Sequence, residues 1–240
     1  MDRLVTKGLN GSQIEITCRG ADLSGPVTSS SVFMIGSELL EVTAGRADFA
    51  EQTVQGLLDG VRFSEEYAFQ GGRLRLGGKE VRVHEPEGVQ VHRPRVAVWN
   101  DHRHSFYAHR HGGTTADLLR LMTRFQVTRS PEGLVVRPAA AAREVTASPA
   151  HPPCVMLAVP DVGILEVVGL SAALEKQLPR WQGTRTRGGE LFVEARGEPR
   201  MHFVLVTPTA RAQLVPFDVR RADRAVTALE VMTVSWRGQG

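Results

Sequence analysis

Apolar and polar side chains alternate along several short stretches of this chain, which is the pattern of strands with one buried face. The alternation is clearest at residues 13–18, 80–83 and 229–236, and residues 31–35 predict a short apolar strand. Helical spacing is confined to a few short segments. The sequence therefore predicts an α+β fold with β-rich antiparallel sheets and a few short helices.

Two of the helical segments resemble each other. Residues 116–136 and 172–193 both predict a helix, then an aromatic residue, then a hairpin, and R-F-Q at 124–126 matches R-W-Q at 180–182 at a constant offset of 56. A weaker third copy begins with a helix over residues 47–58. The pattern favours a fold built from repeated helix-plus-hairpin units, although chance similarity accounts for two such copies equally well.

The helix of the first copy shows why such a unit needs a sheet beside it. Its apolar residues recur every three or four positions, so they share one face that has to be covered. These residues are Leu118, Leu119, Met122 and Phe125. Thr114 or Thr115 can cap the start of this helix.

Residues 138–153 are rich in alanine and proline, a composition that is typical of a linker. We therefore expect two domains. The first is an N-terminal α+β domain over residues 1–143, and the second is a C-terminal α+β domain over residues 154–240. One continuous sheet through both halves is the alternative.

The start of the chain lacks the apolar core of a signal peptide, and no apolar run is long enough to cross a bilayer. Cys18 and Cys154 are far apart and neither has a C-x-x-C partner, which argues against a disulfide framework or a zinc knuckle. These observations predict a cytoplasmic protein that makes no contact with membrane.

Charge is distributed unevenly along the chain. Residues 1–90 contain 13 acidic and 9 basic residues, a net charge of −4, whereas residues 91–240 contain 13 acidic and 20 basic residues, a net charge of +7. Arginine supplies 26 of the 29 basic residues. Arginine forms planar contacts with several hydrogen bonds to phosphate or carboxylate, but a GC-rich genome also produces this bias.

Basic residues and aromatic rings are interleaved from residue 93 to residue 143. This stretch holds nine arginines and three acidic residues, and its rings are Trp99, Phe106, Tyr107 and Phe125. Arginine neutralises phosphate and exposed rings stack on bases, so the composition predicts nucleic-acid binding. The alternative is a solvated basic face over a core that contains the rings. The predicted binding residues, including a second set in the later copy, are Arg103, Arg110, Arg124, Arg129, Arg180, Arg185 and Arg187.

Two H-x-H pairs, His102 with His104 and His109 with His111, lie in one short segment. Alternate residues of a strand point to the same face, so each pair could share a divalent metal ion. The segment contains none of the common metalloenzyme motifs, and arginines beside it disfavour a cation. A surface hairpin is the competing interpretation.

No nucleophile motif and no phosphate-binding loop is present in the sequence. The leading hypothesis is therefore a non-enzymatic protein whose arginine-rich surface engages nucleic acid or an acidic protein partner. The first alternative is a structural subunit of a viral or secretion-type assembly that pairs with copies of itself. The second is a metal-dependent enzyme at the histidine-rich hairpin, which alone would need a cofactor.

Overall fold

The computed structural model describes residues 2–85, 88–195 and 201–238. Strands dominate these residues, and most of their pairs are antiparallel, among them β1–β2, β4–β10, β14–β15, β15–β19 and β17–β18. The helices are short: α1 (Phe49–Leu57), α2 (Thr115–Met122), α3 (Ala172–Glu175), the 3-10 turn η1 (Val219–Arg221) and α4 (Ala222–Val231). The predicted β-rich α+β class is confirmed. No helix within the described ranges has the length and apolar character needed to cross a membrane.

Contacts between residues divide the chain into two units. Unit 1 combines Met1–Ser29 with Pro153–Gly240, and unit 2 is Ser30–Pro152. The later border falls inside the predicted linker, residues 138–153. The first residues of the chain, however, group with its C-terminal part. Separate folding of residues 1–143 and 154–240 stays a prediction.

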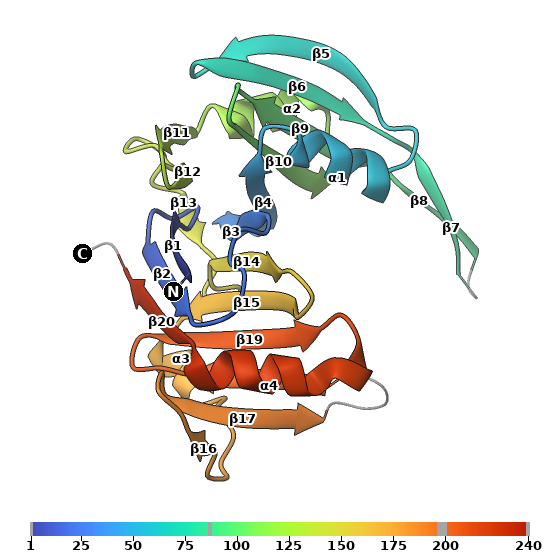
Figure 1. Cartoon of the computed structure of the whole chain (residues 1–240). Coiled ribbons are helices and arrows are strands. Elements are labelled where there is room, and N and C mark those ends of the chain that lie inside the picture. The colour runs from blue at the N-terminus through green and yellow to red at the C-terminus, as the bar shows by residue number, and fades with distance from the viewer. Residues whose placement is uncertain (1, 86–87, 196–200, 239–240) are drawn as a thin grey trace. The chain divides into compact units, whose positions relative to one another are not determined.

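The described part of unit 1 contains two antiparallel sheets (Figure 1). The larger sheet has the order β16-β17-β18-β19-β15-β14, and the smaller has the order β1-β2-β20. Their strands are β1 (Asp2–Lys7), β2 (Gln13–Cys18), β14 (Cys154–Val159), β15 (Gly163–Gly169), β16 (Thr184–Arg185), β17 (Glu190–Ala195), β18 (Met201–Val206), β19 (Ala210–Pro216) and β20 (Thr233–Arg237).

One apolar core joins the two sheets of unit 1 with α4. Ile14 and Ile16 of β2 are fully buried in it, as the predicted strand over residues 13–18 requires. Leu229 contributes from α4, which lies along the larger sheet (Figure 1). Full burial of a side chain of this size stabilises the fold by about 1.5–3 kcal/mol.

The strand predicted over residues 229–236 is only partly correct. Residues up to Val231 belong to α4, and β20 begins at Thr233. Ala225, Ala228 and Leu229 form the buried face of the helix at three- and four-residue spacing. A short apolar run fits both a helix and a strand, so the start of β20 could not be placed from its pattern.

Unit 2 contains a sheet in the order β4-β10-β9-β6-β5, together with two separate hairpins, β7–β8 and β11–β12. β3 begins before the border between the units and pairs with β13. The strands are β3 (Val27–Ile35), β4 (Glu38–Arg46), β5 (Arg62–Phe69), β6 (Gly72–Gly78), β7 (Val81–Glu85), β8 (Gly88–His92), β9 (Pro94–Asn100), β10 (His104–His111), β11 (Phe125–Ser130), β12 (Gly133–Pro138) and β13 (Val145–Ala147).

The helices α1 and α2 of unit 2 pack on this sheet. α1 buries Ala50 and Val54 against Val96, Val98 and Tyr107. α2 begins with a capping box, in which Thr114 and Asp117 each accept a backbone N–H of the other. The predicted face of α2 is confirmed at Leu118 and Met122, whereas Leu119 is only half-buried and Leu121 is buried in its place. Phe125 is buried as well, but it begins β11 and does not belong to the helix.

A tightly packed aromatic pair supports the turn between β9 and β10. Trp99 is fully buried and stacks on Phe106 with 5.4 Å between the ring centroids. Its Nε1–H donates to the carbonyl of Phe69 at 2.8 Å. Gly72 lies so close that a Cβ there would be 2.4 Å from the indole ring, so this position needs glycine.

The helix-plus-hairpin repeat stays a prediction. Each of α1, α2 and α3 is followed by a hairpin, but the hairpins differ in their surroundings. β5–β6 belongs to the large sheet of unit 2, β11–β12 forms a separate pair, and β16 has only two residues. The three segments therefore share an order of elements along the chain, which does not by itself show that they share one structure.

Candidate nucleic-acid interface

Four basic residues of unit 1 gather in the connection between α3 and β17. Residues 176–189, which we call the basic segment, contain Lys176 and three arginines but no acidic residue. Arg180, Arg185 and Arg187 are exposed, and none of them forms an ion pair within the described ranges. Trp181 beside them is 58% exposed. The segment therefore offers positive charge and an aromatic ring to solvent.

Backbone contacts hold the hairpin of the basic segment in place. The N–H of Thr186 donates to the carbonyl of Gly189 at 2.8 Å, and the N–H of Arg187 donates to the carbonyl of Glu230 at 3.3 Å. A Cβ at Gly189 would lie 1.9 Å from the carbonyl oxygen of Val206. The close packing of this turn fixes the backbone from which the arginines project.

Two predicted arginines of unit 2 are already paired with acidic residues. Arg110 lies 2.8 Å from Glu38 and its side chain is only 14% exposed. Arg124 lies 2.6 Å from Glu144. A phosphate would have to compete with these carboxylates, so both residues are weaker candidates than those of the basic segment.

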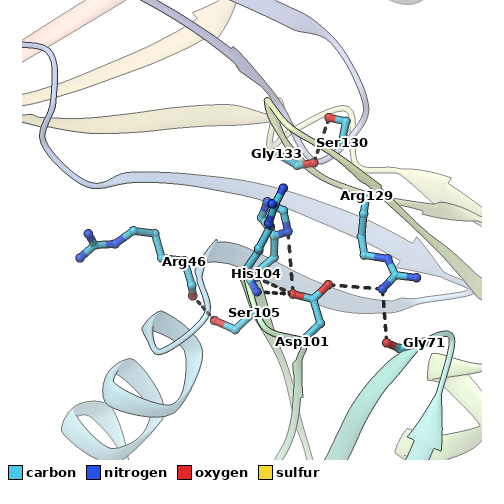
Figure 2. A network of polar contacts seen from close by, with 9 residues as sticks. Arg46, Gly71, Asp101, His104, Ser105, Arg129, Ser130 and Gly133 are labelled. Carbon is cyan, nitrogen blue, oxygen red and sulfur yellow. Dashed lines mark hydrogen bonds and ion pairs between the residues drawn. The ribbon is translucent and has the colours of Figure 1, made fainter.

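The other two predicted arginines, Arg103 and Arg129, line a pocket at the turn between β9 and β10, and Figure 2 shows Arg129 beside Asp101 of this turn. Asp101 organises this turn, because its Oδ1 accepts the backbone N–H groups of Arg103 and His104, both at 2.7 Å. Its side chain is only 4% exposed. Arg129 approaches from β11, with Nη1 3.5 Å from Asp101 Oδ2, and donates to the carbonyl of Gly71 at 3.3 Å.

Burial and the nearby charges both shift the pKa values of Asp101 and His104, the two titratable groups of this turn. Burial raises the pKa of Asp101, but the N–H groups of Arg103 and His104 and the nearby histidines outweigh it and leave that pKa below its ordinary value. Burial lowers the pKa of His104; Asp101 opposes this shift, and Arg103 is among the charges that add to it. At neutral pH we therefore expect a carboxylate beside a neutral imidazole.

A polar pocket of about 250 Å³ opens at this turn. Its lining brings together four residues that the sequence singled out, His102, Arg103, His104 and Arg129, with Asp101. Asp101 Oδ2 and His104 Nδ1 are buried and accept or donate no hydrogen bond within the described part of the chain. The carboxylate offsets one guanidinium, so this pocket is less basic than the basic segment.

The aromatic residues predicted to stack on bases are not available for stacking. Trp99, Phe106, Tyr107 and Phe125 are at most 8% exposed, so they belong to the core. Trp181, whose position matches Phe125 in the aligned segments, is an exposed ring that the sequence did not single out. Arg180 and Gln182 beside Trp181 match Arg124 and Gln126 beside the buried Phe125, so no local signal in the sequence separates the exposed ring from the buried one.

The four histidines predicted as metal ligands lie near opposite ends of β10. His102 is in the turn, not on a strand as predicted, and His104 begins β10, whereas His109 and His111 are at its far end. A strand advances about 17 Å over the five positions from His104 to His109, too far for one ion to bridge. The residues that the structure describes contain no group of three or more His, Cys, Asp or Glu arranged to hold a metal ion.

Comparison of the chain with known proteins gives no relative. No protein-family model, no curated protein and no solved structure matches it.

Proposed function

We propose that this chain is a non-enzymatic protein that binds single-stranded nucleic acid through the basic segment. The observation that carries the proposal is the exposed Trp181 among three exposed arginines, in a stretch without acidic residues. Guanidinium groups neutralise phosphates and release counterions, and an exposed ring stacks on a base with a gain of about 1–3 kcal/mol.

A single strand fits this segment better than a duplex does. The face of the Trp181 ring can stack only on a base whose own face is open, and a duplex keeps these faces inside its stack. The anchored hairpin backbone supports the proposal, because a fixed backbone lowers the entropy lost when the arginines bind phosphates.

Within this proposal, the predicted repeat explains why arginines occur at matching positions in the two aligned segments. Arg124 and Arg129 of the earlier segment correspond to Arg180 and Arg185 of the later one at the offset of 56. In unit 2 the earlier pair contacts Glu144 and Asp101. Arg180 and Arg185 form no ion pair with an acidic residue among the described residues, so we assign nucleic-acid binding to them.

The test is fluorescence anisotropy with a labelled oligonucleotide, single-stranded or duplex, over a range of salt concentrations. We expect the single strand to bind more tightly. Replacing Arg180, Arg185 and Arg187 together by alanine should weaken binding and reduce the slope of log K against log salt by about 2, since each phosphate contact contributes about 0.7.

The matched control removes the same charge elsewhere. Arg82, Arg93 and Arg220 are exposed arginines in ion pairs, and their replacement by alanine should leave the slope unchanged. Trp181→Ala should weaken binding with little effect on the slope. Equal slopes in both triple variants would contradict the proposal, and a lack of binding at low salt would favour an acidic protein partner.

A further inference from the structure

An apolar pocket of about 410 Å³ lies on unit 2, between α1, the β7–β8 hairpin and strands β9 and β10. Its lining includes Val54, Val96 and Tyr107, which belong to the buried core of this unit. Leu58 lines it as well, and Leu57 lines it while 68% exposed. Known small-molecule sites are pockets of about 300–1,000 Å³ with mostly apolar walls, so this pocket falls within their range.

The surface inside the pocket is almost wholly apolar, although four of its residues carry polar atoms. Tyr107 contributes its ring, because its hydroxyl is hydrogen-bonded to Thr43, which does not line the pocket. The histidines of the lining therefore turn ring carbons toward the pocket; they are His92, His109 and His111. Within the described ranges, the lining holds no Asp, Glu, Lys or Arg. A charged ligand would lose its hydration here without gaining an ion pair, so the pocket favours an uncharged one.

The rings of the lining form a continuous row. The ring centroids of Tyr107 and His109 are 6.3 Å apart, those of His109 and His111 are 6.0 Å apart, and those of His111 and His92 are 6.4 Å apart. The first pair is stacked and the other two meet edge to face. Aromatic rings prefer these geometries, and a flat aromatic ligand can make the same contacts with the row. A saturated molecule of the same size would bury similar area but lack these contacts.

We propose that this pocket binds an uncharged aromatic molecule of two or three rings, which packs against the row of rings and covers Leu57. The volume of 410 Å³ holds on the order of 14 groups of the size of a water molecule, at about 30 Å³ each. Two or three joined aromatic rings have about this number of non-hydrogen atoms. The pocket is bounded by a helix, a hairpin and a sheet, and such a concave site suits a small molecule better than the surface of a protein.

The experiment is a titration of the full chain with N-phenyl-1-naphthylamine, an uncharged aromatic probe whose fluorescence rises in an apolar site. We expect saturable binding of one probe per chain, with an affinity that does not depend on protein concentration. A lack of saturable binding would overturn the proposal. An affinity that falls as protein concentration rises would overturn it as well, because the pocket would then be filled by another copy of the chain.

Competition with the bound probe identifies the class of ligand. We expect 1-naphthol, which is uncharged and aromatic, to displace the probe at a lower concentration than two relatives of the same carbon skeleton. These are decahydro-1-naphthol, its saturated counterpart, and naphthalene-1-sulfonate, an anion. Equal displacement by the saturated compound would show that the row of rings recognises nothing aromatic. Stronger displacement by the sulfonate would show that the site selects an anion. Either result would refute the proposed class.

Variants at exposed leucines assign the probe to this pocket. Leu57→Glu places a charge at the lining and should weaken probe binding by about tenfold or more. The matched control is Leu39→Glu, because Leu39 is 51% exposed in the same unit but does not line the pocket. Equal effects of the two substitutions would show that the probe binds elsewhere.

The histidines provide a second assignment that separates ring contacts from hydrogen bonds. His109 is half-buried and His111 is exposed, so both positions should tolerate replacement. Changing both to phenylalanine keeps the rings and should retain probe binding, whereas changing both to alanine should weaken it about tenfold. Loss of binding in the phenylalanine variant, with the fold intact by urea denaturation, would show that imidazole nitrogens hold the ligand and would overturn the proposal.

Discussion

The buried carboxylate of Asp101 offers a sharp test of how the turn between β9 and β10 is held. Asp101→Asn keeps an oxygen that can accept the N–H groups of Arg103 and His104. It replaces the charged oxygen beside Arg129 with an amide group that can itself donate. Hydrogen bonds to a charged group contribute about 1.5–3 kcal/mol and neutral ones about 0.5–1.5 kcal/mol.

The expected cost follows from these contacts. Two charge-assisted bonds that become neutral lose about 1 kcal/mol each. The Arg129 side chain is 44% exposed, so its ion pair adds less than about 1 kcal/mol. We therefore expect Asp101→Asn to lower the free energy of unfolding by about 2 kcal/mol, and Asp101→Ala, which removes the acceptor entirely, by about 3 kcal/mol.

Urea denaturation followed by tryptophan fluorescence measures this loss, because the buried Trp99 lies beside the turn. The m-value should not change. Asp22 provides a control, since its carboxylate accepts the N–H of Ser24 in an exposed turn. Asp22→Asn should lower the free energy of unfolding clearly less than Asp101→Asn does. Equal midpoints for Asp101→Asn and the wild type would refute the assigned role.

The pH dependence separates Asp101 from His104. The folded pKa of Asp101 is lowered, so its stabilisation is present above the unfolded pKa of about 3.9 and is lost as pH falls through the folded pKa. The folded pKa of His104 is also lowered, and its contribution is lost as pH falls below about 6.5. The difference between wild type and Asp101→Asn should therefore shrink below about pH 4. A constant difference would contradict this account.

Three further predictions concern packing, capping and reactivity. Gly72→Ala should destabilise the protein by about 1–3 kcal/mol, measured by urea denaturation, because its Cβ would overlap the Trp99 ring; wild-type stability would contradict the packing. Thr114→Ala should cost about 1 kcal/mol through loss of the helix cap, whereas Thr114→Ser should stay near wild type in the same assay. Burial raises the pKa of the Cys18 thiol, so mass spectrometry should show its reaction with a thiol reagent only after unfolding; rapid labelling of the folded protein would refute its burial.

Local patterns of the sequence were sufficient to predict an element where the burial of one of its faces determines its structure. Residues 13–18 alternate because one face of β2 packs into the core of unit 1, and the cap at Thr114 is a local signal. The beginning of β20 could not be predicted because the preceding apolar run also completes the buried face of α4.

The candidate sites depended on contacts between residues that are distant in the sequence. Arg110 is paired with Glu38, 72 positions earlier, because β4 and β10 lie side by side. No local pattern distinguishes this arginine from the unpaired ones of the basic segment. The sequence likewise did not predict that His92 of β8 and His109 and His111 of β10 line one pocket, because β8 and β10 are distant along the chain.

The division of unit 1 between both ends of the chain affects its folding during synthesis. Thr17 of β2 and Thr233 of β20 share a hydrogen bond across 216 positions. At about 5–20 residues per second, a ribosome needs roughly 10–40 s to make the intervening chain. Unit 2 is contiguous and can fold on the ribosome in that time, while Ile14 and Ile16 still lack most of their core. The apolar residues of β2 therefore stay without most of their packing partners until the C-terminal part of unit 1 has been made.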